Sequence, residues 1–191
     1  KSGFRYWFVD AQVIFSPGIT VFTGLDVYGF GGGAWYKMRR TTPLPNAQTL
    51  TSADTSSRGG PGLTLSGVTF VPDNGINFGF QATLIFGNSG GGQTYNADVT
   101  FGAEFNSSGG IDLMHLDGNV YFITEINDRR DVPVYGSANI SYDFSRNIFS
   151  GIFSVTADVY SILTGSGTVN IYASPDIWYI HVGTPTEPIN L

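Results

Sequence analysis

The sequence predicts an all-β protein: an antiparallel β-sandwich, of jelly-roll or meander type, with about a dozen strands and almost no helix. Three observations indicate this fold class. Apolar and polar residues alternate with period two over most of the chain, as in strands that bury one face. Short turns rich in Gly, Asn and Pro separate these runs. Charged residues make up only 13% of the chain, and the abundant Gly, Ser, Thr and Asn are poor helix formers.

The clearest alternation lies in residues 76–86 and 95–105, on either side of the glycine-rich turn 87–92. Every second residue of both runs is apolar, from Ile76 to Phe86 and again from Tyr95 to Phe105. This pattern predicts a hairpin with one apolar face and one solvated face. Asp98 and Glu104 fall on the polar side of the second run, so we expect them to lie in water.

The other elements follow in chain order. Residues 4–15 are apolar on both alternating faces and predict a covered strand, which Ser16-Pro17-Gly18 then turns back. Asp117-Gly118 predicts a type I′ turn that joins strands 111–116 and 119–124. The long polar segment 39–61 predicts a loop. Further alternating strands are expected at 19–30, 63–71, 134–144, 149–159, 169–173 and 178–182.

Length and ends point to one domain cut from something larger. We expect residues 1–191 to form a single all-β domain. The chain starts Lys1-Ser2-Gly3 without a signal core, which indicates a fragment of a larger secreted precursor. It has no cysteine, which is compatible with an extracellular or cell-surface location. No run reaches the roughly 18 apolar residues of a membrane helix.

The charge balance argues against a nucleic-acid partner. Nine Lys and Arg against fifteen Asp and Glu give a net charge of -6. Nucleic-acid binding normally requires a basic patch. The basic doublets Arg39-Arg40 and Arg129-Arg130 are expected to lie on solvated loops.

No group of residues predicts catalysis, so we expect a protein that is not an enzyme. Gly87-Asn88-Ser89-Gly90-Gly91 resembles the surroundings of the nucleophile in trypsin-like serine proteases. That family places its histidine and aspartate before the serine, whereas the first histidine of this chain is His115. The five residues therefore predict a hairpin turn.

No cofactor is predicted, although calcium is a possible ligand. The oxygen-bearing side chains that could hold it are Asp117, Asn119, Asp128 and Asp131. Two distant histidines make zinc improbable. Asn106 and Asn139 begin glycosylation acceptor sequences and are the candidate glycosylation sites.

Three aromatic doublets offer candidate contacts to glycans. The rings of Trp35, Tyr36, Trp178 and Tyr179 could stack on sugar faces, and each doublet could equally place one ring in the core. The apolar N-terminal strand could instead pair with another copy of the chain. Its candidate assembly residues are Phe4, Tyr6, Phe8, Val13 and Phe15.

The sequence leaves three functional hypotheses open. The first is an extracellular structural module that assembles into a surface layer or fibre, a homo-oligomer or polymer, through strand-edge pairing or a donated terminal strand. The second is a carbohydrate-binding or carbohydrate-cleaving β-sandwich. The third, ranked below the other two, is an outer-membrane β-barrel, which matches the length and the alternation but not the polar, proline-containing residues 184–191 or the single long loop 39–61.

Overall fold

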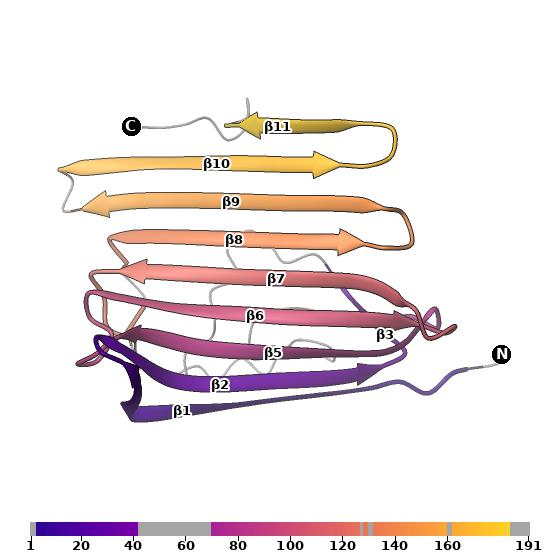
Figure 1. The fold of residues 1–191 in the computed structure, drawn as a ribbon, viewed down its shortest axis with the longest axis horizontal. Coiled ribbons are helices and arrows are strands. Elements are labelled where there is room, and N and C mark those ends of the chain that lie inside the picture. The colour runs from indigo at the N-terminus through magenta and orange to yellow at the C-terminus, as the bar shows by residue number, and fades with distance from the viewer. Residues whose placement is uncertain (1–2, 42–69, 127, 130–131, 160–161, 184–191) are drawn as a thin grey trace.

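The computed structural model describes residues 3–41, 70–126, 128–129, 132–159 and 162–183. They form a nine-stranded sheet in the order β1-β2-β5-β6-β7-β8-β9-β10-β11 and a two-stranded sheet β3-β4 (Figure 1). All pairings are antiparallel, and the described residues contain no helix, so the predicted all-β antiparallel class is confirmed. The strands are β1 (Trp7–Phe22), β2 (Leu25–Tyr36), β3 (Met38–Arg40), β4 (Phe70–Pro72), β5 (Ile76–Asn88), β6 (Tyr95–Asn106), β7 (Ile111–Phe122), β8 (Val134–Asp143), β9 (Ile148–Val159), β10 (Leu163–Ala173) and β11 (Trp178–Val182).

The large sheet is a meander, interrupted once by the small sheet. Successive strands are neighbours, except that β3 and β4 are inserted between β2 and β5 (Figure 1). The small sheet packs on one face of the large one through Trp35, Met38, Phe70 and Ile76, which are all buried. The rings of Trp35 and Phe70 lie 4.3 Å apart. A second layer of strands therefore covers only part of the large sheet.

The cross-strand register assigns every residue to one of two faces. One row along the sheet takes one residue from each strand: Val13, Phe30, Leu84, Val99, Gly118, Ala138, Phe153, Val169 and Val182. None of these residues is polar, and we call their side of the sheet the apolar face. The neighbouring row on the other side, the polar face, is Gln12, Gly31, Thr83, Thr100, Asp117, Asn139, Ile152, Asn170 and His181.

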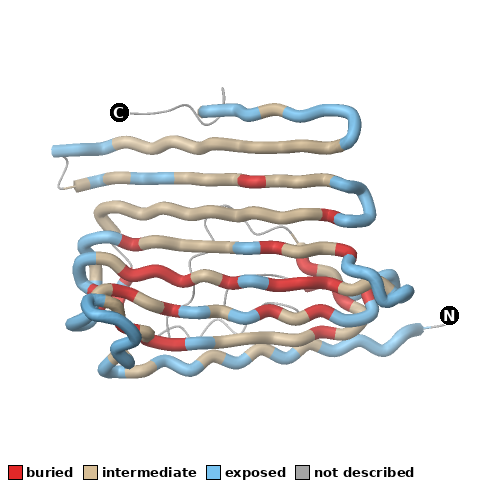
Figure 2. The backbone as a smooth tube through the Cα atoms, viewed as in Figure 1, coloured by how far each residue is buried: buried red, intermediate tan, exposed pale blue. Residues whose placement is uncertain are grey.

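Over β5 to β7 the polar face is more buried than the apolar face, which is the reverse of what the sequence predicts. Asp98 is 3% exposed and Glu104 is 0% exposed, whereas Leu84 on the apolar face is 44% exposed. The expectation that Asp98 and Glu104 lie in water is therefore wrong. In Figure 2 the buried residues gather on β2 and β5–β7. Segments of the same chain that carry Arg40 and Arg129 cover the polar face there.

Two predicted turns are strands in the structure. β7 passes through Asp117-Gly118 without a break and stays paired with β6 and β8. Asp117 accepts hydrogen bonds within the polar face instead of shaping a turn. β1 likewise continues past Ser16–Gly18, with a register shift between Ile14 and Ile19, and the chain reverses only after Phe22. At Asp117-Gly118 pairing with both neighbouring strands outweighs the local turn preference, whereas Ser16–Gly18 form an irregularity of β1 that has no partners on β2.

Candidate functional site

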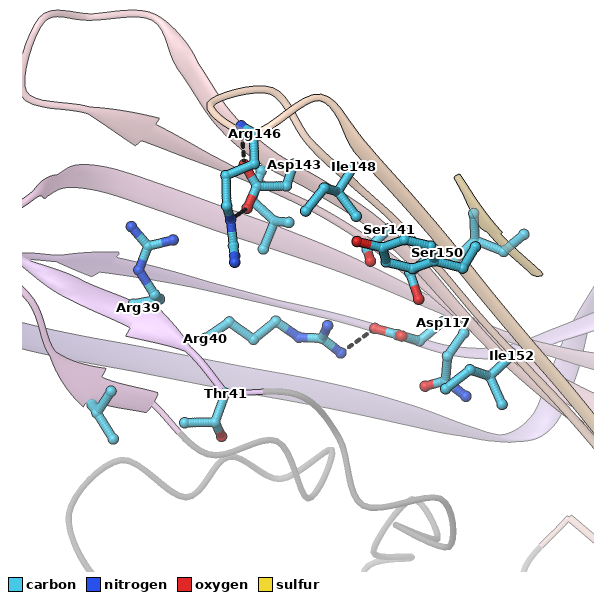
Figure 3. Close-up of a pocket in the computed structure, with 15 residues that line it drawn as sticks. Arg39, Arg40, Thr41, Asp117, Ser141, Asp143, Arg146, Ile148, Ser150 and Ile152 are labelled. Atoms are coloured by element: carbon cyan, nitrogen blue, oxygen red, sulfur yellow. Dashed lines mark hydrogen bonds and ion pairs between the residues drawn. The ribbon is translucent and has the colours of Figure 1, made fainter. Parts of the chain in front are cut away.

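A cavity of about 620 Å³ opens on the polar face between β3 and strands β7 to β10 (Figure 3). β3 contributes Arg39 and Arg40, and β7 contributes Asp117. β8 and the turn after it contribute Asn139, Ser141, Asp143 and Arg146. Farther along the sheet, β9 contributes Ser150 and β10 contributes Tyr172. The volume falls within the range of small-molecule sites.

The cavity exists because small side chains lie between large ones. One row of the polar face runs His115, Ser141, Ser150, Tyr172 from β7 to β10. The two serines fill little of the space between the imidazole and the phenol ring. The space above the two serines, between His115 and Tyr172, therefore stays open.

The wall formed by β7 is a buried set of charged groups. Arg40 donates through Nη2 to Asp117 Oδ2 and forms an ion pair with it (Figure 3). His115 Nδ1 lies 2.9 Å from the same carboxylate oxygen. Burial lowers the pKa of His115 despite that contact, so the imidazole is neutral at pH 7. Gly102 faces His115 across the β6–β7 pair, and a Cβ there would lie 2.1 Å from Nε2.

β3 is tied to β6 and β7 by its two arginines. The backbone N–H of Arg40 donates to Glu104 Oε1 at 2.6 Å. Arg39 contacts Asp73 at 2.8 Å and Asp112 at 2.9 Å. Burial of Glu104 raises its pKa to about 7, although the bond from Arg40 opposes this shift. The small sheet therefore rests on carboxylates of the large one.

The outer rim of the cavity carries a third pair of opposite charges. Arg146 Nε donates to Asp143 Oδ2 at 2.7 Å, and Ser145 Oγ donates to Oδ1 of the same group. Burial alone would raise the pKa of Asp143, but the bonds from Ser145 and Arg146 outweigh it and lower the pKa. Unlike Arg40, Arg146 has a side chain that is 70% exposed.

A separate buried pair lies at the other end of β6. Arg129 donates to Asp98 at 2.7 Å, and its guanidinium lies 4.1 Å from the centre of the Tyr121 ring. Asn119 also donates to Asp98, at 2.8 Å. The expectation of solvated arginine doublets is thus wrong for Arg40 and Arg129, while Arg130 lies outside the described residues.

The calcium candidates do not form one site in the structure. Asp117 is engaged by Arg40 and His115, and Asn119 by Asp98 and Tyr135. Asp128 lies in the segment after β7, and Asp131 lies outside the described residues. Among the side chains that the structure describes, no three His, Asp or Glu residues are grouped to hold a metal ion.

The candidate glycosylation sites lie in contrasting places. Asn106 is the last residue of β6, next to the β6–β7 turn, and its Oδ1 accepts from the backbone N–H groups of Ser108 and Gly110. Asn139 is on β8 and lines the cavity on the polar face. A glycan on Asn139 would fill the cavity described above.

The aromatic doublets split between the two faces. Trp35 is fully buried against Phe70, so it offers no ring face to a sugar. Tyr36 stacks on Trp7 on the apolar face. Trp178 is 74% exposed, and Tyr179 stacks on Tyr172, which lines the cavity.

The candidate assembly strand is an edge of the large sheet, because β1 pairs only with β2 among the described strands. Phe4 and Tyr6 precede it and are exposed, and Val13 is exposed on the apolar face. Phe8 packs against Phe70, 5.1 Å away, and Phe15 packs against Phe30. The outer edge of β1 is therefore unpaired among the described strands, while the side chains of Phe8 and Phe15 pack against other rings of the same chain.

The cavity was not predicted from the sequence. Two of its three arginines come from β3, and Arg40 lies 64 residues before the glutamate that it contacts. The available signal was the Arg39-Arg40 doublet in an otherwise weakly charged chain with several carboxylates on alternate strand positions. No family model, no curated protein and no solved structure matches this chain. In the residues for which the structure gives a conformation, no helix is long and apolar enough to cross a membrane.

Proposed function

We propose that the large sheet is a membrane-spanning wall, with its apolar face against lipid hydrocarbon and its polar face turned inward. The observation that carries this proposal is the apolar row described above, which crosses nine strands without one polar residue. Alternation of apolar-out and polar-in residues is typical of strands that cross a membrane. In water, a contiguous apolar surface of this extent requires a covering partner.

Strand length also favours this proposal. β2, β6, β7 and β9 have 12 residues each, and β5 has 13. β8 has 10 and β10 has 11. A tilted strand crosses the hydrocarbon core with about 9 to 11 residues. Each of these strands is long enough to cross it with a short extension into the interface.

Rings gather at one end of the apolar face. Trp7, Tyr36, Phe78 and Phe105 form one continuous cross-strand row, which extends to Ile111 on β7. Trp7 and Tyr36 are stacked, with centroids 6.4 Å apart. Farther along the sheet, Tyr142 on β8 pairs with Phe149 on β9. Bands of aromatic residues mark the lipid–water interface of membrane proteins built from strands.

The polar face is buried like a protein interior, yet it contains charged groups. Its buried carboxylates meet arginines, as in the pairs Asp98–Arg129 and Asp117–Arg40. Unpaired buried charges are costly, so these pairs allow a polar interior away from bulk water. This arrangement is unlike the apolar centre of a sandwich that folds in water.

Reconstitution tests the proposal. Unfolded chain is diluted from urea into buffer with liposomes, with detergent micelles, or with neither, followed by flotation and circular dichroism. The proposal expects β-structure and co-flotation with liposomes, and aggregation in plain buffer. A monodisperse, fully folded protein in plain buffer that does not float with liposomes would contradict it.

A second candidate function is self-assembly through β1. The specific observation in its favour is the open outer edge of this 16-residue strand. Exposed strand edges are templates for pairing with another chain, and no edge can remain unpaired in lipid. Deletion of residues 1–16 should abolish self-association, measured by size-exclusion chromatography with light scattering. Unchanged assemblies after the deletion would exclude this role for the strand.

A further inference from the structure

We propose that the cavity between β3 and strands β7 to β10 binds a neutral saccharide. The cavity lies on the polar face, whatever covers the apolar face, so the inference does not depend on membrane insertion. Its volume of about 620 Å³ accommodates a ligand larger than a simple ion. Three properties of its walls indicate the class of ligand.

The first property is charge balance. Arg40 faces Asp117, Arg146 faces Asp143, and both pairs line the cavity. Arg39 also lines the cavity, and its guanidinium contacts the carboxylates of Asp73 and Asp112. A free anion would meet a carboxylate beside each guanidinium, and a free cation would meet the reverse arrangement. A neutral ligand avoids both repulsions.

The second property is a mixture of donors and acceptors at short range. Asn139 has an amide with donor and acceptor atoms, and the hydroxyls of Ser141 and Ser150 can do both. The Asp143–Arg146 pair at the rim adds acceptor and donor atoms side by side. The hydroxyl groups of a sugar also donate and accept, so this wall matches them in kind.

The third property is an aromatic ring beside apolar side chains. Tyr172 lines the cavity and stacks on Tyr179 with centroids 5.2 Å apart and planes at 16°. Its cross-strand neighbour on the opposite side is Ser150, which is too small to cover the ring. Ile152 supplies further apolar surface. A sugar ring has an apolar C–H face that packs on such a surface while its edge is hydrogen-bonded.

Isothermal titration of the folded full chain with neutral sugars tests the proposal. The probes are methyl glucoside, N-acetylglucosamine, maltose and lactose, with glucuronate and inorganic phosphate as anionic comparisons. We expect saturable binding of at least one neutral sugar. Ser150→Trp fills the cavity, and Tyr172→Ala removes the ring, so each should weaken binding by about tenfold or more, or ~1.4 kcal/mol.

Tyr142→Ala is the matched control, since Tyr142 lies on the apolar face of β8 and does not line the cavity. It should leave sugar affinity unchanged. The circular dichroism spectrum of each variant establishes that it is folded. Preference for glucuronate or phosphate, affinity unchanged in both cavity variants, or no saturable binding of any neutral sugar would overturn the proposal. These outcomes are independent of flotation with liposomes, so the two proposals can fail separately.

Discussion

The two faces of the large sheet differ in what covers them. On the polar face, Glu104 is 0% exposed beneath β3 of the same chain. On the apolar face, Leu116 is 41% exposed, and its cross-strand neighbour Phe101 is 38% exposed. β3 of the same chain thus covers the charged, polar face, whereas these residues of the apolar face stay exposed. This contrast teaches that alternation defines two faces, while the surrounding medium determines which of them needs protein cover.

Breaking the buried pair on the polar face should have the largest effect. Arg129→Met leaves the carboxylate of Asp98, which is 3% exposed, without its cation. Removal of one partner of a buried pair costs about 3 to 5 kcal/mol. The free energy of unfolding from urea titration measures the loss. Arg146→Met is the matched control: its guanidinium is 70% exposed, and buried Asp143 keeps the hydrogen bonds from Ser145 and from the backbone N–H of residue 146, so the loss should be smaller. Equal losses in the two variants would contradict the contrast in burial.

A charge introduced in the middle of the apolar face tests whether that face contacts lipid or water. Leu116→Arg places a guanidinium midway along β7. In liposomes it should cost about 2 to 4 kcal/mol, whereas Arg near the interface costs about 0 to 1 kcal/mol. Ile111→Arg supplies that comparison, because Ile111 begins the same strand, lies on the same face and is 39% exposed. Urea titrations in liposomes measure both. A sheet face in water would tolerate either change within about 0.5 kcal/mol.

Stability should depend on the titration of Glu104. Its folded pKa of about 7 lies above the ordinary 4.5, so the folded protein binds this proton more tightly than the unfolded chain. The stability gained is complete below pH 4.5 and is lost as the pH rises through 7. The slope reaches at most about 1.4 kcal/mol per pH unit.

The wild type must be compared with Glu104→Gln, because neutral His115 contributes the opposite slope. The lowered pKa of His115 costs stability as the pH falls below 6.5. Subtracting the variant's free energy of unfolding from that of the wild type at each pH removes the histidine contribution. A difference that does not change between pH 4.5 and pH 7 would refute the raised pKa of Glu104.

Two glycines give the smallest and most local comparison. Gly102→Ala puts a methyl group 2.1 Å from the ring of buried His115, and overpacking of this kind costs about 1 to 3 kcal/mol. Gly118→Ala puts one on the apolar face, where the nearest atom is 3.9 Å away. Thermal unfolding should show a lower midpoint for the first variant and little change for the second. A larger effect at Gly118 would indicate that the apolar face is tightly covered.

Much of the fold could be predicted from the sequence, because strand pairing follows local alternation. Residues 78–105 pair as predicted, with the alternating apolar residues on one face of β5 and β6, whereas Ile76 precedes a register shift and is buried with Trp35 on the other face. The continuous strand through Asp117-Gly118 could not be predicted from turn preference. Asp117 is held by Arg40, which lies 77 residues away in the chain, and local propensity contains no information about that partner.

The burial of the carboxylates beside arginines could not be predicted from the sequence, for a related reason. Alternation places Asp98 and Glu104 on one face, but it does not indicate that Arg40 and Arg129 lie against them. The rule that charged residues lie in water assumes that no partner is supplied from elsewhere in the chain. Arg40 and Arg129 supply it to Asp117 and Asp98.

Site-directed spin labelling tests the central claim most directly. The chain has no cysteine, so Leu116→Cys and Ser150→Cys each introduce one labelling site, on the apolar and polar face respectively. In liposomes, the label at 116 should collide with dissolved oxygen and be shielded from a water-soluble nickel chelate, while the label at 150 should show less oxygen contact. Equal access of the nickel chelate to both labels would contradict contact between the apolar face and lipid.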